Sequence, residues 1–136
     1  MLQDGCRLLG LFGMGGVGKT TLATQLAKQI QDQFDYVFWR SVLTVLSFDE
    51  MITDMLSFIS HHKEIKPDIN RVIHYLRAYR CLIILDYLET YLYAFNRKYD
   101  SQYNYFIQII AETNHQSCLI FTSRNQPTAF SLLKNW

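Results

Sequence analysis

The sequence predicts an α/β fold built on a parallel sheet. Short apolar stretches typical of strands alternate along the chain with amphipathic stretches typical of helices, which is the pattern of βαβ units. Four of the six glycines lie together directly after the first such strand, where a tight strand-to-helix turn is expected. The 136 residues, 49% of them hydrophobic, are enough for one domain with a core of its own.

The first strand is predicted at Arg7–Phe12, a short apolar stretch that a glycine ends. The helix after the glycines is expected to begin near Lys19. Leu22, Leu26 and Ile30 lie four residues apart and form one apolar stripe with Ala23 and Ala27, while polar residues take the other side. We therefore expect this helix to pack its apolar stripe against the sheet.

Two further helices follow the second strand, which is predicted at Tyr36–Val42 from its β-branched and aromatic residues. Ser47 and Glu50 have the S-x-x-E spacing of a capping box, so a helix is expected from there. Pro67 and Asp68 begin another helical pattern, whose last turn is basic and so suits the helix dipole.

A buried strand is predicted at Cys81–Leu85, where the residues are continuously apolar and Asp86 follows directly. A helix over 103–113 and a strand over 118–124 continue the alternation. If the first, third and fourth strands are parallel neighbours, then Asp86, Arg124 and the glycines lie at one carboxyl edge of the sheet. Open α/β sheets bind their ligands at that edge.

The glycine-rich stretch matches G-x-x-x-x-G-K-[ST], a phosphate-binding loop, with Gly13, Gly18, Lys19 and Thr20. Residues without Cβ let backbone N–H groups close around a phosphate, and the next helix adds the positive end of its dipole. Lys19 would place its charge on the β and γ phosphates, and Thr20 would offer a hydroxyl to Mg²⁺. With such a loop present, Asp86 is interpreted as the Walker B carboxylate that holds Mg²⁺ through water.

Four stretches, GMGGVGKTTLA, FDYVFWRSV, CLIILDYLE and LIFTSR, follow one another in an order and spacing that resembles the NB-ARC branch of the STAND family of P-loop NTPases. The stretch HQSCLIFTSRNQP, residues 115–127, is especially similar to bacterial members of the family in which the domain precedes WD40 or other repeats. The resemblance covers residues 5–127, and residues 1–136 are interpreted as a partial nucleotide-binding domain of this type.

The resemblance implies a three-layer sandwich with sheet order 5-1-4-3-2, of which this chain would supply strands 1 to 4. It also implies a switch that holds ADP at rest, exchanges it for ATP with Mg²⁺, and then signals. By motif, Walker A is 13–21, Walker B is 81–86 and the sensor is 122–124, where Arg124 would detect the γ phosphate. The residues expected to bind the phosphates are Gly13, Met14, Gly15, Gly16, Val17, Gly18, Lys19, Thr20 and Thr21.

The sequence predicts at most a weak ATPase activity. Many relatives carry a second acidic residue directly after the Walker B aspartate, where it orients the attacking water, but Tyr87 stands at that position here. We therefore expect slow hydrolysis or none, with Lys19, Asp86 and Arg124 as the candidate catalytic residues. Glu89 is an alternative water-orienting carboxylate.

The chain is expected to be a fragment of a longer switch protein, since it starts close to the first strand and stops before a fifth strand. The missing parts would include a winged helix and repeats, and homo-oligomers are expected in the full-length ATP state alone. Two alternatives stay open. A small phosphotransferase would need several lid arginines, whereas residues 87–100 hold only Arg97 and Lys98; a fragment without function is the other.

Composition indicates neither nucleic acid nor a membrane as a partner. The formal net charge is +1, with no long run of either sign. The three cysteines are widely spaced and odd in number, which favours reduced thiols over a disulfide framework. The N-terminal stretch has no signal-peptide pattern and no apolar run is long enough to span a membrane, so a cytoplasmic location is predicted.

Overall fold

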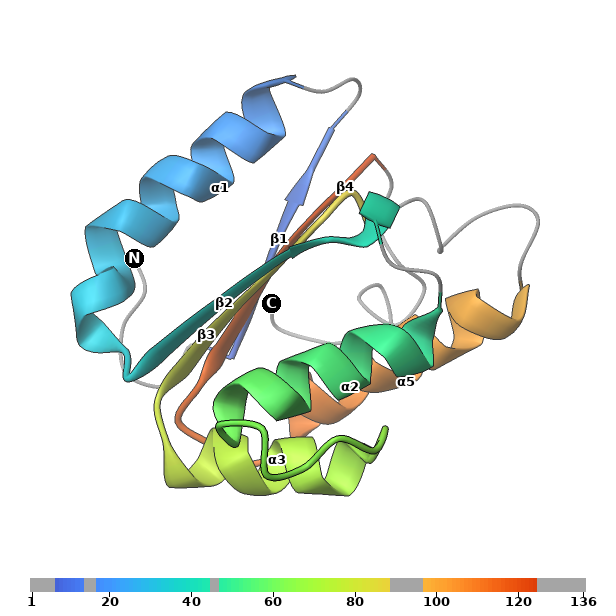
Figure 1. Cartoon of the computed structure of the whole chain (residues 1–136). Coiled ribbons are helices and arrows are strands. Elements are labelled where there is room, and N and C mark those ends of the chain that lie inside the picture. The colour runs from blue at the N-terminus through green and yellow to red at the C-terminus, as the bar shows by residue number, and fades with distance from the viewer. Residues whose placement is uncertain (1–6, 14–16, 45–46, 89–96, 125–136) are drawn as a thin grey trace.

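The computed structural model describes residues 7–13, 17–44, 47–88 and 97–124. In this part of the chain a parallel sheet lies between helices on its two faces (Figure 1), so the predicted α/β class is confirmed. The strands are β1 (Leu8–Phe12), β2 (Tyr36–Ser41), β3 (Cys81–Asp86) and β4 (Cys118–Ser123). The helices are α1 (Val17–Ile30), α2 (Phe48–Ile59), α3 (Ile69–Ala78) and α5 (Arg97–Glu112), with 3-10 turns η1 (Gln31–Gln33) and η2 (Val42–Thr44).

The strands are ordered β1-β4-β3-β2 and every neighbouring pair is parallel. This is the order 1-4-3-2 that the resemblance implied for these strands. In register, Leu11 pairs with Thr122 on β4, and Ser41 pairs with Asp86 on β3. The carboxyl ends of β1, β4 and β3 are therefore adjacent, as the site prediction required.

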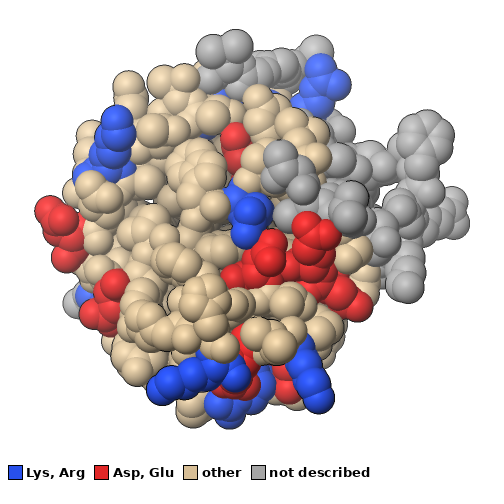
Figure 2. All heavy atoms as spheres, in the orientation of Figure 1, with Lys and Arg blue, Asp and Glu red and all other residues tan. Residues whose placement is uncertain are grey.

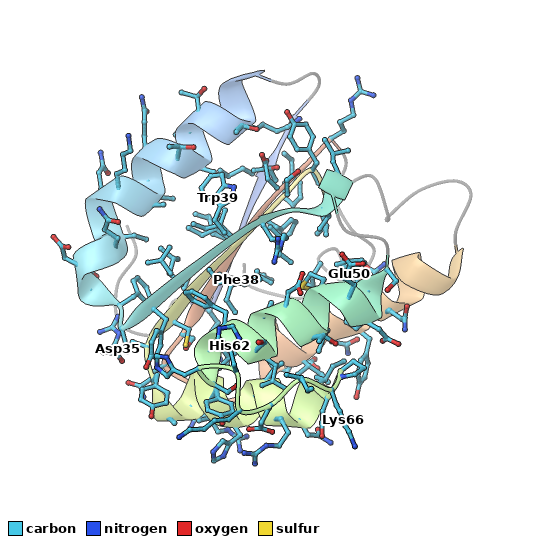
Figure 3. The ribbon with its side chains drawn as sticks, viewed as in Figure 1. Asp35, Phe38, Trp39, Glu50, His62 and Lys66 are labelled. Atoms are coloured by element: carbon cyan, nitrogen blue, oxygen red, sulfur yellow. The ribbon has the colours of Figure 1, made fainter. Side chains whose placement is uncertain are left out.

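The two faces of the sheet are covered unequally. In the described part of the chain, α1 covers one face, while α2, α3 and α5 lie over the other (Figure 1). Phe38 and Trp39 of β2 point to opposite faces (Figure 3), and Phe38 is buried whereas Trp39 is 38% exposed. The buried residues of the α1 face are Ala23, Leu26, Ala27, Ile30, Leu82, Ile84, Cys118 and Ile120. The larger core on the other face includes Met51, Met55, Leu76, Tyr103, Phe106 and Phe121.

Both predicted helix starts have side-chain caps. The Ser47 hydroxyl accepts a hydrogen bond from the Glu50 backbone N–H at 3.1 Å, as the capping box predicts. The Asp68 carboxylate accepts bonds from the backbone N–H groups of Asn70 and Arg71. The local signals therefore place the starts of α2 and α3.

Three expectations differ from the structure. Leu22 is 50% exposed, because the stripe of α1 that packs on the sheet is narrower than predicted and consists of Ala23, Leu26, Ala27 and Ile30. Helix α1 begins at Val17, two residues before Lys19. Helix α5 begins at Arg97 rather than at 103, because its first turns lack the apolar spacing on which the prediction relied.

Candidate functional site

The predicted phosphate-binding loop joins β1 to α1 at the carboxyl edge of the sheet (Figure 1). Gly13 has a φ of +152°, which residues with a Cβ rarely adopt, so the first turn of the loop requires glycine. The Lys19 ammonium donates a hydrogen bond to the Gly13 carbonyl and so lies against the start of the loop. Residues 14–16 of the predicted loop lie outside the described residues.

Thr20 and Asp86, the two residues predicted to hold a metal, are in contact. The Thr20 hydroxyl lies 3.0 Å from Asp86 Oδ2 and 3.2 Å from Oδ1, although the residues are 66 positions apart in the chain. Asp86 is the last residue of β3 and only 3% exposed. The sheet order therefore brings a hydroxyl from the first turns of α1 onto a buried carboxylate.

Thr122 joins the same carboxylate from β4. Its hydroxyl donates a hydrogen bond to Asp86 Oδ1 and accepts one from the Tyr87 backbone N–H at 2.9 Å. A second backbone bond, 2.9 Å long, runs from the N–H of Leu88 to the carbonyl of Thr122. Tyr87 has a φ of +64°, in the left-handed region that a bulky residue rarely occupies. Sequence reasoning missed this contact, because strand register brings Thr122 to Asp86 and no local motif does.

The predicted sensor residues differ in exposure. Thr122 and Ser123 are buried within β4, with exposures of 1% and 0%. Arg124 directly follows the strand and is exposed. Of the expected sensor 122–124, the residue whose side chain reaches the surface is therefore Arg124. Glu89, the alternative water-orienting carboxylate, lies outside the described residues.

The oxygen atoms of Thr20 and Asp86 suit a magnesium ion that phosphate oxygens also bind. A hydroxyl and a carboxylate are oxygen ligands, which Mg²⁺ prefers. Among the described residues no group of three or more His, Cys, Asp or Glu side chains could hold a metal. A metal at Thr20 and Asp86 would therefore need further ligands from a phosphate or from water, which is how Mg²⁺ is typically held in nucleotide sites.

A second polar network lies at the amino edge of the sheet. The Ser117 hydroxyl accepts a bond from the Cys81 N–H at 2.9 Å and donates toward the carbonyls of Leu76 and Tyr79, each 2.9 Å away. His115 Nδ1 accepts a bond from the Ser117 N–H at 3.0 Å, and Nε2 donates to a carbonyl of α5 at 2.8 Å. These bonds require the neutral imidazole, and burial lowers the pKa of His115.

The surface adds little to the site. On the face that Figure 2 draws, acidic and basic side chains are interspersed among uncharged residues without a broad area of one sign. The described part of the chain contains no helix with the length and apolarity needed to cross a membrane. A groove of about 540 Å³ between α2, α3 and α5 includes Phe48, Lys66 and Tyr105 in its lining but none of the predicted site residues.

Comparison with known proteins identifies relatives of the chain. The model of the NB-ARC domain family matches residues 1–132. An uncharacterized WD repeat-containing protein of Nostoc sp. is 39% identical over 144 aligned residues, which cover 92% of this chain and 11% of that protein. A probable disease resistance protein of Arabidopsis thaliana is 33% identical over 95 residues, which cover 63% of this chain and 13% of that protein. The chain thus spans a small part of the length of these curated relatives.

Proposed function

The chain belongs to the NB-ARC family, and we propose that it binds ADP or ATP together with Mg²⁺ as the nucleotide-binding module of a signalling switch. The observation that carries the proposal is the contact of the Thr20 hydroxyl with the buried Asp86 carboxylate beside the phosphate-binding loop. A hydroxyl and a carboxylate at that position are the residue types that a Mg-nucleotide site needs.

The loop would bind the phosphates through its backbone and through Lys19. The first N–H groups of any helix have no partner within it, so those at the start of α1 would be available to a phosphate. Lys19 would exchange its bond with the Gly13 carbonyl for the β and γ phosphates. Arg124, exposed at the end of β4, would contact the γ phosphate and so distinguish ATP from ADP.

Thr20 and Asp86 would hold Mg²⁺, with Asp86 acting through water. When bound, Mg²⁺ neutralises charge on the phosphate oxygens. The Thr20 hydroxyl donates a hydrogen bond to Asp86, so the lone pairs of the Thr20 oxygen remain available to a cation. Asp86 is buried, and the hydrogen bonds that its carboxylate accepts from hydroxyl donors offset part of the cost of burying it.

Slow or absent hydrolysis is part of the proposal. Tyr87 stands where an acidic residue would orient the attacking water, and a phenol is a poor general base at neutral pH. Its partly buried side chain packs against the core on the α2, α3 and α5 face of the sheet. A site that binds nucleotide for long periods suits a switch better than an enzyme with rapid turnover.

The remainder of the switch would lie in a longer protein. The relatives are much longer than the aligned segment, and one of them is named for WD repeats. We therefore propose further domains, including a winged helix and repeats, and oligomers that form in the ATP state. The proposed location is the cytoplasm, where adenine nucleotides are available.

A thermal melt of the chain with and without Mg-ADP tests the proposal, with Lys19→Ala as the matched variant. At about 100 times the dissociation constant, ligand should stabilise the wild-type chain by roughly 2.7 kcal/mol. The variant should melt at the same temperature without ligand and should not shift with it. Equal shifts for both proteins, or none for the wild type, would contradict the proposed site.

A further inference from the structure

We propose that Thr122 is a positioning residue for the Asp86 carboxylate and takes no part in sensing phosphate. This inference rests on the proposed Mg-nucleotide site and concerns what holds that site in shape. The observation behind it is a chain of hydrogen bonds in which the Tyr87 N–H donates to Thr122 and the Thr122 hydroxyl donates to Asp86.

Thr122 has no hydroxyl proton to spare for a phosphate oxygen and no exposure to reach one. A threonine hydroxyl has one proton, and Thr122 uses it on Asp86 Oδ1. Its oxygen accepts the Tyr87 N–H at 2.9 Å, which fixes the direction in which that proton points. With 1% of its surface exposed, the side chain is not accessible to a phosphate in solution.

The backbone after Asp86 is shaped to support this bond. Tyr87 has a φ of +64°, a conformation that is costly for a residue with a Cβ and persists only where the surroundings enforce it. Two backbone bonds to Thr122 accompany it, from the N–H of Tyr87 to the hydroxyl and from the N–H of Leu88 to the carbonyl. The turn thus attaches the two residues that follow Asp86 to Thr122 of β4.

The consequence is a carboxylate with a fixed plane. Thr122 bonds to Oδ1 from β4, while Thr20 lies 3.0 Å from Oδ2 on the α1 side. Two hydroxyls on different elements therefore oppose rotation of the group before any metal arrives. Hydrogen-bonding partners of direct metal ligands typically contribute a 10-fold to 100-fold effect on metal affinity, and because Asp86 would act through water we expect the lower end of that range.

The test compares Thr122→Val, which keeps the shape and removes the hydroxyl, with Thr122→Ser, which keeps the hydroxyl. ADP binding is measured by titration calorimetry in excess Mg²⁺ and again in excess chelator, and each protein is also melted without ligand. We expect Mg²⁺ to tighten ADP binding to the wild type and to Thr122→Ser. In Thr122→Val this tightening should fall about tenfold, while binding in chelator stays the same.

If Thr122 had a purely structural role, its substitution would change other measured quantities. It would weaken ADP binding equally with and without Mg²⁺, or lower the melting temperature alone, and either result overturns the inference. Should Thr122→Val not melt cooperatively, Thr122→Cys replaces it, because a thiol is a weak donor of similar size. A wild-type chain that binds no ADP overturns the proposed function together with this inference, whereas a normal Mg²⁺ response of Thr122→Val overturns this inference alone.

Discussion

The two ends of β3 and β4 both carry buried hydrogen-bond networks, but the networks differ in what they hold. At the carboxyl edge, hydroxyls from α1 and β4 converge on the charged side chain of Asp86. At the amino edge, Ser117 and His115 bond to backbone groups at the ends of α3 and α5 and at the start of β3. The first network consists of two threonine hydroxyls around an aspartate, and the second consists of a serine and a histidine.

The network at the amino edge supports the fold, whereas the network at the carboxyl edge surrounds the proposed binding site. Backbone groups at helix and strand ends must be paired if they are buried, so the amino-edge network is a requirement of folding. A buried carboxylate is a cost to folding that hydroxyl donors can offset in part, and in our proposal Asp86 serves ligand binding rather than stability. Substitutions at the carboxyl edge should therefore change ligand binding, whereas substitutions at the amino edge should change the free energy of unfolding.

Asp86→Asn should give the largest effect, and on ligand binding rather than on folding. The amide has no charge with which to hold Mg²⁺, so the Mg²⁺-dependent part of ligand stabilisation should disappear, up to roughly 2.7 kcal/mol at about 100 times the dissociation constant. The unliganded melting temperature should not fall, because a buried charge is removed. Melts with and without Mg-ADP measure both. A less stable protein that keeps its ligand shift would show that Asp86 serves folding rather than binding.

Ser117→Ala should show the reverse behaviour. It leaves the Cys81 N–H and the carbonyls of Leu76 and Tyr79 without their side-chain partner, at a cost of about 1–3 kcal/mol. Urea unfolding measures the loss, and the Mg-ADP shift should be unchanged. Ser60→Ala is the control, since that buried hydroxyl bonds to a single backbone N–H and should cost less. Loss of ADP binding in Ser117→Ala would show that the edges are not independent.

His115→Gln should produce a smaller effect that depends on pH. Burial lowers the folded-state pKa of His115 below its usual 6.5, so the unfolded chain binds the proton first on acidification. Wild-type stability should therefore fall as the pH drops through 6.5 toward the lower folded pKa, and the variant should lack this part of the fall. Urea unfolding at about pH 7.5 and about pH 5.5 tests it. His74→Gln, at an exposed position of α3, should keep the wild-type slope.

Glu64→Gln should have the smallest effect and gives a baseline for a pair outside both networks. Glu64 and Arg71 form a two-pronged pair at 2.8 and 2.9 Å on the surface, and this pair lowers the pKa of Glu64 from 4.5 to about 2. The pair stabilises the fold above pH 4.5, and the contribution is lost as the pH falls toward 2. The melting temperatures of wild type and variant should therefore differ slightly at neutral pH and converge on acidification. A divergence would contradict the sign.

Much of the fold could be predicted because local signals carry it. The continuous apolar run before Asp86, the capping box at Ser47 and the cap at Asp68 each act within a few residues, and the strand or helix appears where they place it. Leu22 was misplaced because helical spacing shows which residues share a side but not how wide the buried stripe is.

The site could be predicted in part. Lys19, Thr20 and Asp86 follow from residue types and from the expectation of adjacent strand ends, and the structure brings Thr20 onto Asp86. Thr122 was assigned to the sensor because the motif treats 122–124 as a unit, whereas the pleat and the register set its partner. Strand register depends on side chains far away in the chain, so no stretch of sequence encodes that contact.

The position of β1 in the sheet has a consequence for how the chain acquires its activity. In the described sheet β1 is paired with β4, and Leu8 is in register with Leu119 near the other end of the sequence. Pairing of such distant segments is slow, because the entropy of closing a long loop is lost before the stabilising contacts form. During synthesis β1 leaves the ribosome early and waits for β4, while β2 and β3 are free to pair. The phosphate-binding loop that we propose at the end of β1 can therefore reach its final position only after β4 has been made, and nucleotide binding by a nascent chain would begin no earlier.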